Sequence, residues 1–427
     1  MGEANGAPKE RGPSAVGGDQ AAVRRGNLAR VLGEIRQPGT HSRAAVAART
    51  GLTKATVSSL VTELIERRLV RESGRQQAGN VGRPGRLLEL DGGSVAALGL
   101  EVNANYLAVR GVDLAERVLV ERRVAFDGAA TDASESVGEL ARLAEDAIAQ
   151  VRGAGALLAG VGVAVPGLVD VPTGTVRYAP NLLWQDVPIA EWLRRRLDLG
   201  ADVTVAVDNE ANLAAVAEFG SEANTASNLV YLTGETGVGA GLISDGRLLR
   251  GSDGFSGEIG HIPVDPSGAR CGCGQVGCLE TRIGLVAAVR TAAPDLAGTA
   301  LDPEELAQAL LERAEAGEPR ALAGLDEIGR WLGVGISIAV NLLNPEKVVL
   351  GGYFATVSPY VVPTAMRELR SRAVAGQAAI CPITASAFGF TAAARGGTGV
   401  IAEEVFRDPW RAPLGAEVSP ARSEDTA

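Results

Sequence analysis

The chain has 427 residues, of which 46% are apolar and 22% are charged, and its formal net charge is −10. This composition is that of a chain that can bury a core and excludes a wholly disordered one, and the length suits roughly three compact units at ~150 residues each. The apolar stretch 154–169 is interrupted by glycines and Pro166, which excludes an ordinary membrane helix, and the N-terminus lacks a signal-peptide pattern. Four cysteines are too few for a disulfide scaffold. We therefore expect a cytoplasmic protein with no membrane partner.

The charge is divided unevenly along the chain. Residues 21–90 hold 13 Lys and Arg against five Asp and Glu, whereas residues 91–427 hold 26 against 43. A small basic module therefore precedes a large acidic body. A basic module fits a polyanion partner, which the acidic body would repel, although an arginine-rich solvated face would give the same counts.

The basic module, residues 21–92, is predicted to be a winged helix-turn-helix that follows a disordered leader, residues 1–20. Its first helix is expected from about Gly26 to Arg36. Ser42 is a candidate cap for a second helix through Arg49, and Thr53 for a third helix. The expected buried stripes are Leu28, Val31, Leu32 and Ile35 on the first helix and Val57, Leu60, Val61 and Leu64 on the third. A two-stranded ribbon, 69–71 and 86–90, would form the wing.

The third helix leaves short hydroxyl side chains and a lysine outside its apolar stripe, a pattern that suits base edges and phosphate oxygens. The tip of the ribbon carries an arginine between glycine and proline, which fits a minor groove. The candidate DNA contacts are Thr53, Lys54, Thr56, Ser58, Ser59 and Arg83. The alternative is a small helical bundle used for protein contacts. His41, just before the second helix, is expected at the surface.

From residue 93 to 410 the pattern changes to alternating strands and helices, which predicts an α/β body, and residues 411–427 predict a disordered tail. The expected strands are 95–102, 105–112, 117–124, 160–165, 203–207, 228–233, 238–243 and 347–351. The expected helices include 134–152, 188–197, 210–219, 304–315 and 320–343. No fixed-period repeat is present.

One imidazole and three thiols lie close together in the sequence, at His261, Cys271, Cys273 and Cys278. Glycines between them allow a short loop to surround one ion, and a Cys₃His set completes a tetrahedral zinc shell. A closed shell leaves no position for a reacting water, so the zinc would be structural, one per chain. A glycine-rich loop with idle thiols is the alternative. The fourth cysteine, Cys381, lies in an apolar stretch and is expected in the core.

Carboxylates and amides gather at three places in the body: at Asn181, at Asp208 to Asn212, and at Glu258 to His261 with Glu280. Such groups in a cleft suit the hydroxyls of a sugar. Each has a structural alternative, which is helix capping for Asp208 and Asn209 and support of the zinc ligands for Glu258 and Glu280. The glycine-rich run 232–241 could expose N–H groups to a phosphate or simply form a hairpin.

Together these motifs resemble the ROK family (repressor, open reading frame, kinase) over about residues 24–405. The residues that carry the resemblance are the run from Gly257 to His261, the three cysteines with Glu280, the runs 165–170, 179–182 and 209–212 with Glu218, and the runs 344–346 and 351–352. The N-terminal module with Gly82-Arg83-Pro84 is similar to the repressor branch, which includes xylose and N-acetylglucosamine repressors.

The resemblance implies a two-lobed, actin-like sugar-kinase body with a structural zinc loop. It also implies sugar contacts at Asn181, Asn209, Glu210, Glu258, His261 and Glu280, and a homodimer or higher oligomer. The expected function is a sugar-responsive transcriptional regulator, most simply a repressor of carbohydrate-metabolism genes that binds operator DNA.

Three departures from the family's kinases argue against phosphoryl transfer. The kinases carry Asp-x-Gly-Gly-Thr on the first hairpin, where this chain has Glu101-Val102-Asn103-Ala104-Asn105. The kinase base is an aspartate, and Glu210 would move the carboxylate by roughly an ångström, which can cost about a hundredfold in rate. Glu235 stands where the kinases have glycine. We therefore expect no enzyme activity, no catalytic residue and no ATP; an ATP-dependent sugar kinase with an added DNA module is the alternative.

Overall fold

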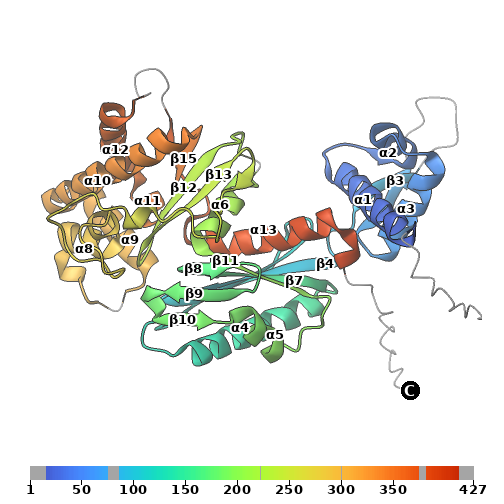
Figure 1. Ribbon diagram of the computed structural model, residues 1–427, viewed down its shortest axis with the longest axis horizontal. Helices are drawn as coiled ribbons and strands as arrows, with labels where there is room; N and C mark the ends of the chain where they lie inside the picture. The colour runs from blue at the N-terminus through green and yellow to red at the C-terminus, as the bar shows by residue number, and fades with distance from the viewer. Residues whose placement is uncertain (1–15, 76–85, 222, 300, 375–380, 413–427) are drawn as a thin grey trace, which may run out of the picture. The chain divides into compact units, whose positions relative to one another are not determined.

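The computed structural model describes residues 16–75, 86–221, 223–299, 301–374 and 381–412 (Figure 1). The described chain divides into two compact units. One contains the residues up to Asp91 together with those from Glu404 onward, and the other spans Gly92–Glu403. Within the described ranges, no helix has the length and apolar character needed to cross a membrane.

The first unit is a three-helix cluster beside a small sheet. Its elements are α1 (Val16–Arg36), α2 (Arg43–Thr50), α3 (Lys54–Glu66), β1 (His41–Ser42), β2 (Val70–Arg75) and β3 (Arg86–Leu90), with the antiparallel strand order β1-β3-β2. The Ser42 hydroxyl accepts from the Ala45 N–H, and the Thr53 hydroxyl accepts from the Thr56 N–H. Both predicted caps are therefore confirmed, and the predicted stripes of α1 and α3 are buried. Helix, turn, helix and ribbon form the predicted winged arrangement.

Two features of this unit differ from the predictions, and a third lies outside the described residues. Helix α1 begins at Val16, so residues 16–20 are helical and not part of a disordered leader. The glycines at 17 and 18, poor helix formers, hid this start. The prediction of a surface position for His41 is wrong: its side chain is 3% exposed. His41 lies in β1, which pairs with β3, and its Nε2 lies 2.8 Å from the Gln37 carbonyl oxygen. The predicted wing tip with Arg83 lies outside the described residues.

A short segment after the body, residues 404–412, completes the first unit. It comprises the last turn of α13 (Ala392–Arg407) and the 3₁₀ turn η5 (Pro409–Arg411). The Trp410 indole N–H donates to the Glu63 carboxylate of α3 at 2.7 Å, and its ring lies beneath the guanidinium groups of Arg25 and Arg67. Arg25 also pairs with Asp408. The segment therefore anchors α1 and α3 from the far end of the sequence.

Replacing Trp410 with alanine is expected to loosen α3. The change removes a hydrogen bond to a charged acceptor and two cation–π contacts, together about 1–2 kcal/mol of local stability. Amide hydrogen exchange of α3 in the full chain should then accelerate about tenfold. Trp410→Phe keeps the ring and should show a smaller change. Unaltered exchange of α3 in Trp410→Ala would show that the segment is not an anchor.

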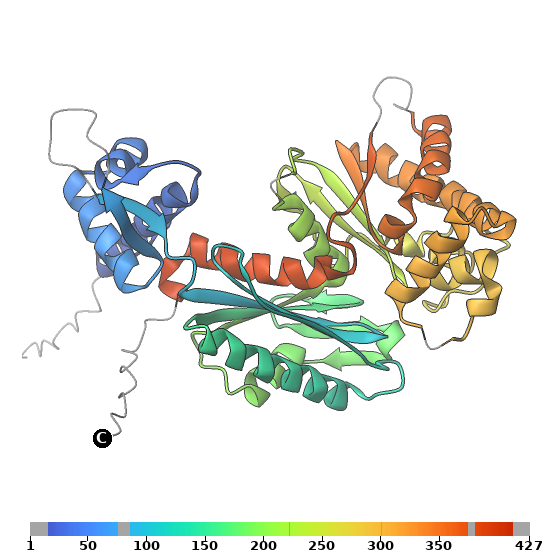
Figure 2. The ribbon, with the colours of Figure 1, turned by 180° about the vertical axis from the view of Figure 1, so that it is seen from behind.

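The second unit begins with a five-stranded sheet. Its strands are β4 (Val95–Val102), β5 (Tyr106–Asp113), β6 (Val118–Ala125), β7 (Leu157–Val165) and β11 (Thr204–Asn209), in the order β11-β7-β4-β5-β6. Figure 2 shows α4 (Ala133–Gly153) on one face and α13 on the other. Helix α13 approaches closely because glycines face it: a Cβ at Gly99 would lie 1.9 Å from the Ala394 carbonyl oxygen. Helix α5 (Ile189–Arg196) and a small sheet, β8 (Leu168–Asp170), β9 (Thr175–Ala179) and β10 (Trp184–Val187), complete this first lobe.

A second five-stranded sheet forms the second lobe. Its strands are β12 (Leu229–Gly234), β13 (Val238–Ser244), β14 (Arg247–Leu248), β15 (Lys347–Gly352) and β16 (Ile383–Ala385), in the order β14-β13-β12-β15-β16. Its helices are α6 (Glu210–Phe219), α7 (Glu280–Ile283), α8 (Leu285–Ala292), α9 (Pro303–Glu315), α10 (Pro319–Leu343), α11 (Tyr353–Thr356) and α12 (Ser358–Arg372).

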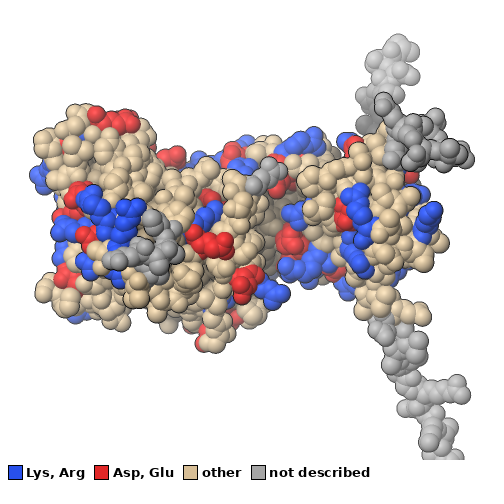
Figure 3. Space-filling view, turned by 90° about the horizontal axis from the view of Figure 1, so that it is seen from above, with Lys and Arg blue, Asp and Glu red and all other residues tan. Residues whose placement is uncertain are grey.

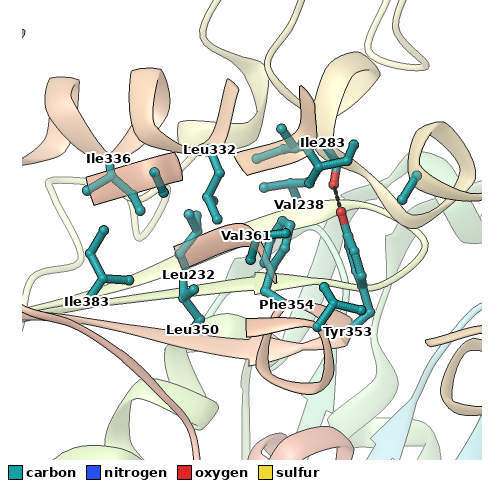
Figure 4. Close-up of a cluster of buried hydrophobic side chains, with 14 of the residues drawn as sticks. Leu232, Val238, Ile283, Leu332, Ile336, Leu350, Tyr353, Phe354, Val361 and Ile383 are labelled. Carbon is teal, nitrogen blue, oxygen red and sulfur yellow. Dashed lines mark hydrogen bonds between the residues drawn. The ribbon is translucent and has the colours of Figure 1, made fainter. Parts of the chain in front are cut away.

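The core of this lobe joins the sheet to its helices (Figure 4). Leu232 and Leu350 of the sheet meet Leu332 of α10 and Val361 of α12, and the Tyr353 hydroxyl donates to the Ile283 carbonyl oxygen. Cys381 is buried in the same cluster, as predicted. Each predicted strand and helix of the body is present, with bounds within three residues. The core holds the turn that follows β12, which contributes to the site described next.

Candidate functional site

The turns at the ends of β4, β11 and β12 meet at a small pocket between the two sheets of the body. Its described lining consists of Asn103, Ala104, Pro166, Asn181, Glu210, Thr233, Glu235, Thr236, Gly237 and Gly239. The first sheet contributes Asn103 after β4 and Glu210 after β11. The second sheet contributes Glu235, from the glycine-rich turn between β12 and β13. The pocket therefore collects side chains from both lobes, as ligand sites at the ends of sheets commonly do.

Glu235 is hydrogen-bonded across this boundary. Its Oε2 accepts from the Asn103 amide at 2.8 Å and lies 2.9 Å from the Tyr106 hydroxyl, which lies 2.7 Å from Glu101 Oε1. One hydroxyl proton cannot serve two carboxylates, so one of the two carboxyl groups must carry a proton to complete both contacts. Thr236 adds a third bond between the lobes, donating to Asn105 at 2.7 Å.

Burial changes the protonation of these acids. Burial, aided by the charge of Glu235, raises the pKa of Glu101 to about 8. Burial also raises the pKa of Glu235 to about 7, against the lowering effect of the Tyr106 hydrogen bond. The pKa of Glu210 is raised by burial and then by the charges of Glu235 and Glu101. The pocket is therefore lined by two carboxyl groups, those of Glu210 and Glu235, and backed by a third, that of Glu101, and burial disfavours the ionised form of all three.

Several residues predicted to contact sugar lie at or beside this pocket. A Cβ added to Gly237 would lie 2.7 Å from Glu280 Oε2 and 3.2 Å from Asn181 Nδ2, so these two side chains flank the same turn. Glu258 lies 3.9 Å from His261 Nε2. Burial raises the pKa of Glu258, which the positive form of His261 opposes.

Asn209 caps a helix, the structural role that the sequence offered as the alternative to sugar binding. Its amide oxygen caps α6 by accepting from the N–H groups of Ala211 and Asn212, and its amide nitrogen donates to the Gly167 carbonyl oxygen. Asp208 is likewise occupied: it accepts from Asn212 and pairs with Arg250 at 2.7 Å. These contacts fix the start of α6 and with it the position of Glu210.

The predicted metal ligands do come together. One ligand atom from each of His261, Cys271, Cys273 and Cys278 lies within 4.8 Å of the others. His261 presents Nδ1 to this group, 3.5 Å from Cys271 Sγ, so its Nε2 points to Glu258. Burial raises the pKa of the Cys271 and Cys278 thiols. Bound metal would favour their thiolates, and the ligand types and spacing fit a Cys₃His zinc shell.

Glu280 connects this cluster to the pocket. One carboxylate oxygen accepts from Cys271 Sγ at 3.3 Å and the other accepts from the Val238 N–H at 2.9 Å. Val238 begins β13, directly after the turn that carries Glu235. The loop that carries the candidate metal ligands is thus hydrogen-bonded to one wall of the pocket.

In the first unit, α3 presents a shallow groove to solvent, lined by Arg24, Ala55, Ser58, Ser59, Thr62, Glu63, Glu66 and Arg67. Of the predicted DNA contacts, Thr53, Lys54 and Ser59 are exposed, while Thr56 and Ser58 are partly buried. In Figure 3 basic side chains outnumber acidic ones on this unit. The sequence did not single out Arg24 and Arg43, which donate hydrogen bonds to Ser59 and Ser58 beside the predicted DNA contacts. Both lie outside α3, in helices whose sequences carry no DNA-contact pattern.

Models of known protein families match parts of both units. The model of the ROK family matches residues 97–404, nearly the whole body. The chain belongs to the ROK family. A second family model, the IclR helix-turn-helix domain, matches residues 35–74, which span α2, α3 and β2. The ROK assignment and the helix-turn-helix predicted from the sequence are both confirmed.

Relatives and a solved structure agree with this assignment. The chain is 29% identical to the xylose repressor of Bacillus spizizenii over 356 residues, covering 83% of this chain and 89% of the relative. It is 30% identical to the DNA-binding transcriptional dual regulator NagC of Escherichia coli, covering 81% and 85%. A crystal structure of a ROK family transcriptional regulator, a homologue of the E. coli MLC protein, matches with a TM-score of 0.75 and 26% identity over 90% of this chain and 97% of that one. The chain is thus a ROK transcriptional regulator with a DNA-binding helix-turn-helix.

The structure shows how the residues of the first hairpin that differ from those of the ROK kinases are used in this chain. Glu101 and Asn103 of the first hairpin are not open to a ligand phosphate, because they are committed to Tyr106 and Glu235. Tyr106 and Arg123, whose guanidinium lies 4.0 Å above the Tyr106 ring, were missed by sequence reasoning. Their role depends on a contact between lobes more than 100 residues apart in sequence, which no local pattern reveals.

Proposed function

We propose that this ROK regulator is a repressor of carbohydrate-metabolism genes whose DNA binding responds to a sugar held in the cleft of the body. The observation that carries the proposal is a DNA-binding module over residues 35–74 joined to a ROK body over 97–404. Relatives that match more than 80% of this chain are named for xylose repression and as NagC. Such a regulator would act in the cytoplasm, where its operator lies.

On the DNA side, the proposal places α3 in the major groove of each half-site. A homodimer would present two such helices to successive grooves of a pseudo-palindromic operator. The N-terminal turn of α3 carries Lys54 and exposed hydroxyls, and partly buried Ser58 is held by Arg43. Arg83 of the wing would reach the adjacent minor groove.

On the ligand side, the proposed sugar contacts are Asn181, Asn209, Glu210, Glu258, His261 and Glu280. Asn209 would use the amide N–H that does not bond Gly167. A structural zinc ion, one per chain, would be held by His261 and the three cysteines and would fix the loop of Glu258 and Glu280. A sugar shifts DNA affinity only by its different affinity for the two states of the protein.

The proposal includes the loss of phosphoryl transfer, since Glu235 fills the turn where a phosphate would need N–H donors and positive charge. ATP-dependent phosphorylation of a hexose or pentose by the purified chain, abolished in Glu210→Gln, would contradict this part. It would favour the alternative, a sugar kinase with an added DNA module.

The direct test is fluorescence anisotropy on DNA from upstream of the chain's own gene, at fixed salt and with non-specific competitor. Xylose, glucose and N-acetylglucosamine would be added in turn. We expect a specific complex whose affinity one sugar changes. A specific complex that no sugar alters would contradict the sugar response, and the absence of a specific complex on any fragment of the upstream region would contradict the repressor.

Replacing Lys54 and Arg83 together with alanine is expected to weaken operator binding about tenfold or more. Each contact to phosphate that is lost should also reduce the slope of log K against log salt by about one. Sugar binding, measured by calorimetry, should be unchanged. Arg142→Ala, an exposed arginine of α4 in the body, serves as the control for simple loss of charge. Unchanged DNA affinity in the double variant would refute these contacts.

A further inference from the structure

The pocket between the lobes is acidic, and this bears on the class of sugar that it can hold. Two of its described lining residues, Glu210 and Glu235, carry carboxyl groups, and no described lining residue carries a cation. Glu101 lies directly behind Glu235, joined through the Tyr106 hydroxyl. Glu280 flanks the opposite side of the same turn. A ligand in this pocket is therefore surrounded by acids.

The cations nearest to these acids are already paired. Arg123 lies over the Tyr106 ring and forms ion pairs with Glu304 and with Asp302, the latter at 3.5 Å. Arg250, two residues after β14, pairs with Asp208, which lies just before α6. Arg250 could turn to a new anion only by leaving the buried Asp208 carboxylate unpaired, which is costly, and Arg123 only by giving up its ion pairs with Asp302 and Glu304.

The hydrogen-bond donors that a phosphate would need are also occupied. The Asn103 amide and the Tyr106 hydroxyl both face the Glu235 carboxylate, which holds the place of an anion between the two hairpin turns. The Val238 N–H, at the end of the glycine-rich turn, donates to Glu280. A phosphate entering here would have to displace a carboxylate that is fixed by both lobes.

We propose that this cleft selects an uncharged sugar and rejects its phosphorylated form, with Glu235 as the residue that determines the selection. The inference rests on the proposed sugar-responsive function and narrows its ligand class. Neutral hydroxyls can donate to carboxylates and accept from protonated carboxyl groups, so either protonation state of Glu210 and Glu235 serves a neutral sugar. A phosphate group, which carries close to two negative charges at neutral pH, meets like charge whenever these groups ionise.

The size of the discrimination follows from Coulomb's law. Two unit charges ~6 Å apart, at an effective dielectric constant of ~20, shift a binding constant by about a hundredfold. Partial protonation of the glutamates at neutral pH reduces this factor. We therefore expect the phosphate to bind at least ~tenfold more weakly than the parent sugar at pH 7, and more weakly still at pH 8.5, where Glu235 is ionised.

The test is isothermal titration of the full-length chain with matched pairs: xylose and xylose 5-phosphate, glucose and glucose 6-phosphate, and N-acetylglucosamine and its 6-phosphate. Glu235→Gln keeps the size and hydrogen bonding of the side chain but removes its charge. It should narrow the ratio between the phosphate and parent affinities severalfold, because removing the negative charge favours the phosphate more than the parent sugar. Glu145→Gln, an exposed glutamate of α4, should leave the ratio unchanged.

The possible outcomes separate this inference from the function on which it rests. A phosphate that binds as tightly as its parent sugar, or a ratio that Glu235→Gln leaves unchanged, would overturn the inference while leaving a sugar-responsive regulator intact. Binding of neither form of any sugar would overturn the sugar-binding part of the proposed function, and the inference with it.

Discussion

Cys273→Ser is expected to yield a chain without zinc, whereas the wild-type protein should carry about one zinc per chain after dialysis against metal-free buffer. The expectation follows from the four ligand atoms, which lie within 4.8 Å of one another. A structural Cys₃His shell holds zinc through all four ligands, so loss of one thiolate should weaken binding enough for dialysis to empty the site. Elemental analysis by mass spectrometry of the purified proteins measures this directly.

The same variant should lose its response to sugar and keep its DNA binding. Glu280 joins the cluster to the pocket wall, so a disordered metal loop would misplace Glu280 and Glu258, while α3 belongs to the other unit. Cys381→Ser is the matched control, because Cys381 lies in the core of the second lobe and outside the cluster. A wild-type chain that is fully folded without metal would show that the loop needs no ion.

Glu235→Gln is expected to become progressively more stable than the wild type as the pH rises from about 6 to 8. The folded-state pKa of Glu235 is raised to about 7 from an unfolded value of 4.5, so the folded chain binds more protons in this window. Stability therefore falls as the pH rises through the window and levels off above the folded pKa. Glutamine does not titrate, so the variant escapes this loss.

We expect a difference of about 1 kcal/mol between pH 6 and pH 9, because the loss of one proton from a group with a folded pKa of about 7 can change the stability by at most ~1.4 kcal/mol over this range, and Glu235 is partly exposed. Urea unfolding of both proteins at several pH values measures it. Glu145→Gln, which lacks such a partner network, should run parallel to the wild type. If Glu235→Gln also runs parallel, Glu235 does not hold a proton in the folded protein over this range, and the proton of the pair belongs to Glu101.

The sequence predicted the parts of the molecule that depend on local pattern. Apolar periodicity predicted the buried stripe of α3, and the hydroxyl residues Ser42 and Thr53 predicted the N-caps of α2 and α3. The spacing of the cysteines predicted the metal cluster. These signals are local because a helix, a cap or a short loop is decided by residues a few positions apart.

What the sequence did not reveal arises from contacts between distant segments. Tyr106 lies in a strand with no unusual pattern, and its importance comes from Glu101 and Glu235 meeting at its hydroxyl. Trp410 lies in a stretch that the sequence assigned to the end of the body, yet its indole N–H donates to Glu63 of α3. Asn209 matched a sugar-binding motif, but only the structure shows that its side chain caps α6.

The discontinuity of the DNA-binding unit has a consequence for synthesis of the chain. Helices α1 to α3 leave the ribosome first, but residues 404–412, which hold Glu63 and Arg25 through Trp410 and Asp408, are translated only after the entire body. A nascent chain that has not finished its body therefore has an operator-binding module without its anchor. The DNA-binding unit would thus be completed last, after the whole body has been synthesised.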